Sequence, residues 1–179
     1  MANKNPLHDI PPGKDFPEVV NAIIEIPKGS KVKYEMDKET GMIRLDRFLF
    51  SAMHYPGDYG FIPQTHWDDG DPLDIIILTG EPVYPGTLVT AKVIGVLHMT
   101  DQGESDDKII AVYEKDPRYK KINSITDLQP HFLEEIKHFF ETYKELEQKE
   151  VKVLSIKGKE DAHKALKKGV ELYRKKFGN

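Results

Sequence analysis

The chain has no cysteine among its 179 residues, which excludes disulfide bonds and thiolate metal sites. It has no apolar run near the roughly 20 residues that a membrane-spanning helix needs. Its first residues, 1–6, lack the apolar core of a signal peptide. Positive charge is not in excess, because the formal net charge is −4. We therefore expect a cytoplasmic protein that binds neither membranes nor nucleic acids.

Length and composition favour a single folded domain, residues 1–179. Hydrophobic residues make up 39% of the chain, enough for a core, and charged residues make up 31%, which implies a strongly polar surface. No internal repeat, linker or low-complexity segment divides the sequence.

The first two thirds of the chain have the pattern of short strands. After a proline-rich arm over 1–18, strands are predicted at 19–26, 31–36, around Arg44 to Arg47, and at 75–79, 88–99 and 108–113. The second and third of these are expected to form a hairpin across a turn at 37–41. In the aromatic segment 51–67, two prolines and two glycines are expected to prevent any regular element.

Helices are predicted only in the C-terminal half. Apolar residues recur with a period near 3.6 over 131–146 and again over 162–177, with a short strand between them around 151–156. Short strands followed by helices predict a mainly β fold with flanking helices (α+β), in which two helices of the C-terminal half pack outside a compact barrel.

One segment stands out chemically, Asp69-Gly70-Asp71-Pro72-Leu73-Asp74, which places three carboxylates just before an apolar strand. Gly70 allows a tight bend and Pro72 restricts the backbone, so the carboxylates can converge on a hard cation such as Mg²⁺, Mn²⁺ or Ca²⁺. The spacing does not fit an EF-hand loop, since positions five, six and twelve have the wrong residues. A plain turn with no ligand is the alternative.

A second acidic loop covers 101–107 and also lies between apolar strands. If the two loops face one another, Asp101 and Asp106 join the first three aspartates around one cavity, and several metal ions would share them. Lys33, Arg47 and Lys108 would then suit a polyanion such as a phosphate chain. The alternatives are a solvated loop, surface lysines and arginines, and an Arg44–Asp46 surface pair.

These residues resemble those of family I soluble inorganic pyrophosphatases of prokaryotic length, from about Gly13 to Lys149. The segment from Asp69 to Ile75 matches the family signature throughout. Further matches are Ile24-Glu25-Ile26-Pro27, Lys33-Tyr34-Glu35, Asp46-Arg47, Tyr55-Pro56, Asp58-Tyr59-Gly60, Met99-Thr100-Asp101, Asp106, Lys108 and 138–144. Gln102 departs from the pattern, because relatives commonly have an acidic residue there. The resemblance implies a five-stranded OB-type barrel and a homohexamer.

The resemblance also implies roles. Asp69, Asp74 and Asp106 would be the main metal ligands, with Asp101 and Glu35 serving further ions. Asp71 would take a proton from the attacking water. The phosphates would be held by Lys33, Arg47, Tyr59, Tyr143 and Lys144, with Lys108, Glu25 and Tyr55 lining the site. The cofactor would be Mg²⁺, several ions per subunit, with Mn²⁺ or Zn²⁺ as substitutes. The reaction would be hydrolysis of pyrophosphate to two phosphates.

Two further expectations can be compared with the structure. Phe139 and Phe140 are about 100° apart on a helix, so we expect one of them to face another subunit. The rival function is a module that binds single-stranded nucleic acid, for which an OB-type barrel would present aromatic stacking platforms. Its candidate residues are Phe48, Phe50, Tyr55, Tyr59 and Phe61.

Overall fold

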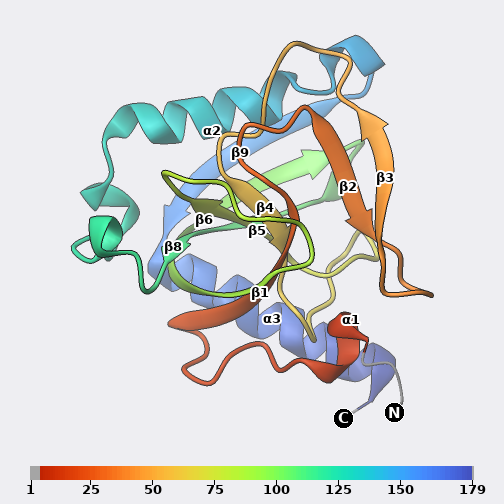
Figure 1. The fold of residues 1–179 in the computed structure, drawn as a ribbon, viewed down its shortest axis with the longest axis vertical. Coiled ribbons are helices and arrows are strands. Elements are labelled where there is room, and N and C mark those ends of the chain that lie inside the picture. The colour runs from red at the N-terminus through yellow and green to blue at the C-terminus, as the bar shows by residue number, and fades with distance from the viewer. Residues whose placement is uncertain (1–4, 179) are drawn as a thin grey trace.

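The computed structural model describes residues 5–178 (Figure 1). Its helices and strands are, in chain order, α1 (Pro6–Asp9), β1 (Val19–Ile26), β2 (Val32–Met36), β3 (Ile43–Phe48), β4 (Asp58–Phe61), β5 (Asp74–Leu78), β6 (Leu88–Asp101), β7 (Glu104–Ser105), β8 (Lys108–Tyr113), α2 (Pro130–Thr142), β9 (Val151–Gly158) and α3 (Lys159–Phe177). Three short 3₁₀ helices are η1 (Pro117–Tyr119), η2 (Ile125–Asp127) and η3 (Glu145–Glu147). The expected N-terminal arm contains α1, and its first four residues lie outside the described part.

Five strands close into a ring. The pairing runs β1–β4–β5–β8–β6, and β6 pairs back onto β1. All of these pairs are antiparallel except β5 with β8, which are parallel neighbours. The long β6 extends beyond the ring, where β7 and β9 pair with it. The prediction of a five-stranded OB-type barrel with helices outside is confirmed.

The two long helices lie on opposite sides of the strands, α2 across the top and α3 across the bottom of Figure 1. Side chains alternate along β5, as the pleat requires. Ile75 and Ile77 belong to the apolar cluster that contains Leu166 of α3, whereas Ile76 belongs to the cluster that contains Phe139 and Phe140 of α2. Among the described residues, no helix has the length and apolar character needed to cross a membrane.

The expectation that segment 51–67 has no regular element is wrong, because β4 lies within it and pairs with both β1 and β5. Its glycine explains the error. A Cβ built on Gly60 would lie 1.9 Å from the carbonyl oxygen of Ile23. Gly60 therefore permits close approach of two backbones inside the sheet and does not interrupt the strand.

The expectation for α2 is also corrected. The helix ends at Thr142, earlier than the pattern predicted, and η3 follows it. Phe139 and Phe140 are both buried, at 2% and 1% exposed, so neither faces another subunit. The Phe139 ring lies 4.8 Å from that of Tyr55, and the Phe140 ring lies 6.2 Å from that of Tyr59, measured between centroids. The helix sits deep enough against the core to bury an apolar stripe wider than 100°.

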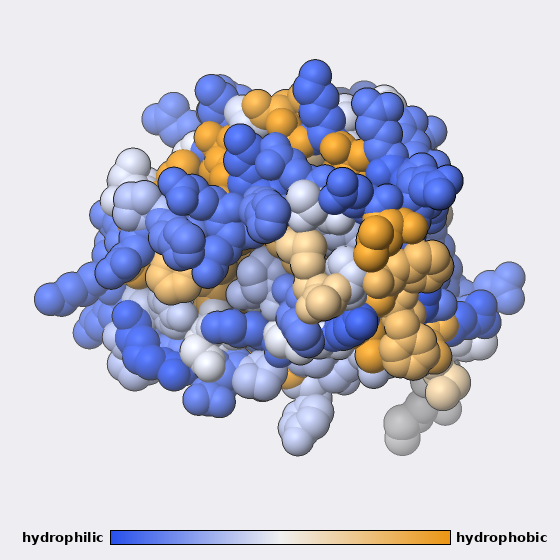
Figure 2. Space-filling model, turned by 90° about the horizontal axis from the view of Figure 1, so that it is seen from above, coloured by the Kyte–Doolittle hydropathy of each residue, from blue (hydrophilic) through white to orange (hydrophobic). Residues whose placement is uncertain are grey.

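Strands β2 and β3 form a separate two-stranded sheet, as the hairpin prediction required. Lys33 and Arg47 are paired across it. The hairpin is tied to the ring by Glu25 of β1, whose Oε1 accepts a hydrogen bond from the backbone N–H of Met36 at 2.7 Å. Several apolar side chains of the hairpin and its flanks are exposed, namely Met42, Leu45, Phe48 and Phe50. Figure 2 shows apolar side chains gathered at the right of this face, with further apolar patches among the hydrophilic residues toward its top.

Candidate active site

The first acidic loop is a fixed turn. The N–H of Trp67 donates to the carbonyl of Asp71 at 2.7 Å, and Gly70 has a φ of +91°, in the left-handed region. The Asp69 carboxylate accepts a hydrogen bond from the N–H of Asp71 at 3.0 Å, so turn chemistry accounts for one of its oxygens. Leu73 is fully buried and anchors the end of the loop in the core.

The parallel pairing of β5 with β8 brings the two acidic loops together. Asp74, the first residue of β5, stands beside Lys108, the first residue of β8, so the loops that precede the two strands end at the same edge of the ring. Between them is a cavity of about 430 Å³. It is lined by Lys33, Tyr59, Asp69, Asp71, Asp74, Asp101, Gln102, Glu104, Asp106, Lys108, Tyr143 and Lys144. All five aspartates singled out in the sequence therefore face one space.

A smaller cavity of about 110 Å³ adjoins the first and shares Lys33, Tyr59, Asp71 and Asp74 with it. Its other lining residues include Glu25 and Glu35. Within residues 5–178, Arg47 and Tyr55 line neither cavity. Tyr55 instead packs against Tyr59, with ring centroids 5.5 Å apart. Arg47 stands opposite Lys33 in the β2–β3 hairpin.

Lysines lie between the carboxylates. The ammonium of Lys108, only 2% exposed, donates to Asp74 at 2.6 Å and also to Asp106. Lys144 pairs with Asp101 in the same way. Within the described part of the chain, no three acidic or histidine side chains are grouped closely enough to hold a metal ion by themselves. In this structure the positive charge beside Asp74, Asp101 and Asp106 therefore comes from lysine ammonium groups.

Two of the carboxylates are harder to ionise than an exposed aspartate. Burial, together with the charges of Asp74, Asp106 and Asp71, raises the pKa of Asp69 to about 7, although the N–H of Asp71 acts against this. Burial and the charge of Asp106 also raise the pKa of Asp74, despite Lys108 beside it. The Oδ1 atom of Asp101 is buried and has no hydrogen-bond partner among the described residues. Crowded oxygens with an unmatched acceptor fit a hard divalent cation.

Arg47 is held by two carboxylates. Its Nη1 donates to Asp46 at 2.6 Å and its Nε donates to Glu147 at 3.0 Å. Lys33 also pairs with Asp46, at 3.2 Å. The suggested Arg44–Asp46 surface pair is wrong, because Arg44 pairs with Asp37 at 2.7 Å.

Sequence reasoning missed two charged residues that contact the predicted ones, Glu147 and Lys38. Lys38, in the turn between β2 and β3, pairs with Asp71. Glu147 lies beside the exposed Leu146, and nothing in the pattern distinguishes it from a surface glutamate. Their contacts join residues 33 and 100 positions apart, so no local signal could have identified them.

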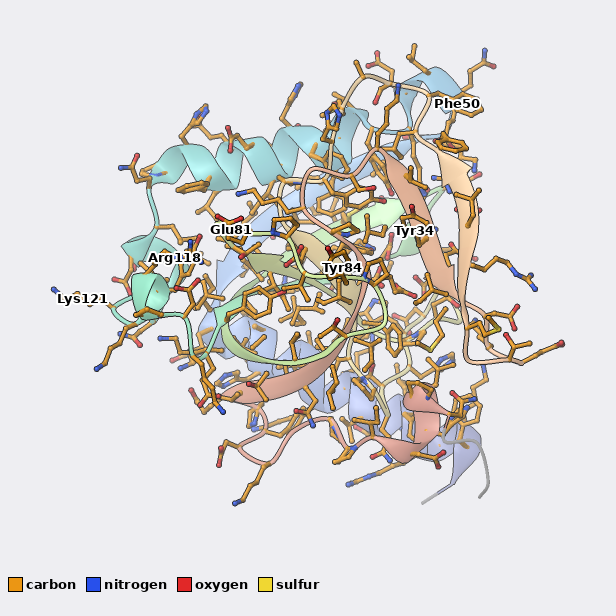
Figure 3. The ribbon with its side chains drawn as sticks, viewed as in Figure 1. Tyr34, Phe50, Glu81, Tyr84, Arg118 and Lys121 are labelled. Carbon is orange, nitrogen blue, oxygen red and sulfur yellow. The ribbon has the colours of Figure 1, made fainter. Side chains whose placement is uncertain are left out.

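The rival nucleic-acid function is disfavoured by burial. Tyr55, Tyr59 and Phe61 are at most 7% exposed and cannot offer a ring face to a base. Phe48 and Phe50 are exposed, and Phe50 projects outward near the end of β3 in Figure 3. Two exposed rings do not make the aromatic, positively charged groove that single strands require.

Comparison with known proteins decides the family. The family model described as inorganic pyrophosphatase matches residues 22–174. The chain belongs to the inorganic pyrophosphatase family. It is a hydrolase that converts pyrophosphate to two phosphates, and the family is metal-dependent.

Individual relatives agree with this membership. The chain is 51% identical over 173 residues to soluble inorganic pyrophosphatase 2 of Chlamydomonas reinhardtii, a match that covers 97% of this chain and 90% of the relative. The inorganic pyrophosphatase structure from Thermus thermophilus superposes with a TM-score of 0.92 at 42% identity and covers 96% of this chain and 99% of its own. The structure from Helicobacter pylori gives 0.85 at 44% identity and covers 88% and 94%.

Proposed function

We propose that this pyrophosphatase works in the cavity between the two acidic loops, uses Mg²⁺, and hydrolyses pyrophosphate by direct attack of water without a covalent intermediate. The observation that carries the proposal is the meeting of five aspartates with lysines and tyrosines around one cavity of about 430 Å³. A phosphate chain needs both cations and hydrogen-bond donors, and this lining offers both.

Asp69, Asp74, Asp101 and Asp106 would hold the metal ions, with Glu35 serving a further ion at the edge of the site. Carboxylate oxygens favour Mg²⁺, and Mn²⁺ or Zn²⁺ would be substitutes. Bound Mg²⁺ supplies positive charge against the phosphates and lowers the pKa of a coordinated water. The unmatched Oδ1 of Asp101 supports a cation at this position.

Asp71 would act as the general base. Its side chain is 56% exposed, lines both cavities and is paired only with the flexible Lys38 in the described part of the chain. It therefore has freedom to accept a proton from the attacking water, whereas Asp74 is locked between Tyr59 and Lys108.

Lys33, Arg47, Tyr59, Lys108, Tyr143 and Lys144 would hold the two phosphates. Burial, together with nearby carboxylates, raises the pKa values of the Tyr59 and Tyr143 phenols well above their ordinary range, so both remain donors. Burial lowers the pKa of Lys108, but the charges of Asp74 and Asp106 outweigh it and keep the amine protonated. Glu25 and Tyr55 would complete the walls of the site.

The test is phosphate release from pyrophosphate by the full chain, with Mg²⁺ and with EDTA. We expect release only with metal, and loss of most turnover in Asp74→Asn. A matched control is Glu171→Gln on the outer face of α3, which should hydrolyse at the wild-type rate. Full turnover in EDTA would contradict the metal requirement, and full turnover in Asp74→Asn would contradict this location.

The proposal also covers the oligomeric state, the cellular location and the number of domains. We infer a homohexamer in the cytoplasm and a single domain over 1–179. The exposed apolar side chains of the β2–β3 hairpin and its flanks support subunit contacts. Sedimentation at micromolar concentration should give the mass of six chains of 20.5 kDa, whereas the mass of one chain would contradict the hexamer.

A further inference from the structure

Glu147 is a buried acid that the proposed reaction does not use. Its side chain is only 5% exposed, although it lies in the short helix η3, between the exposed residues Leu146 and Gln148. Buried carboxylates are rare unless a partner compensates for the lost hydration. The contacts of Glu147 therefore indicate why this charge is inside.

The main partner is Arg47. Glu147 Oε1 accepts a hydrogen bond from Arg47 Nε at 3.0 Å, and its Oε2 lies 3.5 Å from the ammonium of Lys149. Asp46 accepts from Arg47 Nη1 at 2.6 Å. The third guanidinium nitrogen, Nη2, is buried and has no hydrogen-bond partner within residues 5–178. Two carboxylates thus fix the plane of the guanidinium and leave the N–H groups of Nη2 for another acceptor.

The same contact joins two separate parts of the site. Arg47 lies on β3, in the two-stranded sheet outside the ring. Glu147 follows Tyr143 and Lys144, both of which line the cavity. In Figure 1 the light-blue turn after α2 reaches the upper end of β3. The two residues are 100 positions apart in the chain, so the hydrogen bond fixes one group of proposed phosphate ligands relative to the other.

The local backbone makes this possible. The N–H of Glu147 donates to the carbonyl of Lys144 at 3.0 Å, which turns the chain back directly after the cavity. Gln148 then has a φ of +56°, a left-handed conformation that ends η3. This turn brings Glu147 against Arg47 of the hairpin instead of leaving it in solvent.

We propose that Glu147 is a positioning residue for phosphate binding, which holds the Arg47 guanidinium in place so that its unpaired Nη2 remains available to a phosphate oxygen. This inference rests on the proposed role of Arg47 as a phosphate ligand. Glu147 touches neither substrate nor metal in this scheme and acts only through the guanidinium.

The experiment is a double-mutant cycle with inorganic phosphate as the probe. Binding of phosphate to the Mg²⁺-loaded full chain is measured by calorimetry for wild type, Arg47→Ala, Glu147→Ala and the double variant, and KM and kcat are recorded where turnover permits. Glu147→Gln retains an acceptor for Arg47 Nε and serves as the conservative variant. Glu145→Gln removes an exposed carboxylate from the same turn and is the matched control.

We expect Glu147→Ala to weaken phosphate binding by roughly 10- to 100-fold, as misplacement of a binding group does. KM should rise more than kcat falls, and Glu147→Gln should recover part of the loss. In the Arg47→Ala background, Glu147→Ala should cause no further loss of phosphate affinity, because the guanidinium through which Glu147 acts is already absent. Glu145→Gln should bind phosphate like wild type.

Other outcomes distinguish the positioning role of Glu147 from the phosphate-binding role of Arg47. If Arg47→Ala weakens phosphate binding and Glu147→Ala does not, Glu147 has no positioning role while the role of Arg47 stands. Losses that add in the double variant would mean that Glu147 acts independently of Arg47, which also overturns the inference. If Arg47→Ala binds phosphate as wild type does, Arg47 is not a phosphate ligand and both proposals fail. Should Glu147→Ala not fold, Glu147→Gln in the same cycle gives the decision.

Discussion

The charged side chains of the cavity and those on the outer face of α3 are the same residue types with different physical states. On α3, Lys175 and Glu171 pair at 2.7 Å with side chains 68% and 65% exposed. In the cavity, Lys108 and Asp74 pair at 2.6 Å with side chains 2% and 20% exposed. Water screens the first pair and barely screens the second. The same residue types therefore form a weakly interacting pair on the surface of α3 and a strongly interacting group in the cavity. Burial shifts the pKa values of that group and makes its charges available to bind metal and phosphate.

The largest expected effect comes from Asp71, the least buried of the carboxylates that we assign to the reaction. Asp71→Asn retains the size of the side chain and removes its basicity, so turnover should fall by roughly 10² to 10⁴. The melting temperature should hardly change, because its exposed pair with Lys38 contributes little stability. Phosphate release and a thermal melt check this, and near-wild-type turnover at saturating Mg²⁺ would remove Asp71 from the base role.

A second prediction concerns Glu25, a buried carboxylate of the site. Burial raises the pKa of Glu25 from 4.5 to about 8, although the N–H of Met36 acts against this. Between these values the folded protein binds a proton that the unfolded chain has lost. This group therefore makes stability fall as pH rises from about 4.5 to about 8, with no further change above that.

Glu25→Gln mimics the neutral acid and keeps the acceptor for Met36, so it should remove this loss. In EDTA, the free energy of unfolding of the variant minus that of wild type should grow by a few kcal/mol between pH 5 and pH 9. Urea unfolding at several pH values measures it. A difference that does not depend on pH would mean that Glu25 is ionised in the folded protein at neutral pH.

The smallest effect is expected on α3. Glu171→Gln breaks the pair with Lys175, and both turnover and the melting temperature should stay at wild-type values within about 1 °C. The same melt in high salt should show no added difference. A large loss of either property would mean that exposure alone does not separate the two groups of charges.

Local pattern predicted much of this molecule. The bounds of β1 and β8 follow directly from apolar runs, and the acidic segment before β5 indicated where carboxylates would meet. Gly60 was misinterpreted because a breaker and a close backbone contact have the same residue type, and only the neighbouring strand distinguishes them. Phe139 and Phe140 were misjudged because the depth of a helix in the core is not visible in its own sequence.

For the site too, residues could be predicted only where the local sequence carries a signal. Asp74 and Lys108 could be proposed from sequence because each begins an apolar strand, and parallel pairing then places them together. Glu147 and Lys38 could not, since their partners are 100 and 33 residues away and their neighbours in sequence resemble any solvated turn. Buried charge networks depend on long-range packing, which a single sequence does not display.

The central claim is that the aspartates of the cavity bind metal, and thermal melts test it most directly. Wild type, Asp69→Asn and Asp74→Asn are melted in EDTA and in Mg²⁺. Mg²⁺ at ~100 times its dissociation constant should stabilise wild type by about 2.7 kcal/mol per independent site. Both variants should gain less, and in EDTA they should equal or exceed wild type because repulsion is relieved. Equal Mg²⁺ shifts in all three proteins would show that these aspartates are not its ligands and would contradict the account.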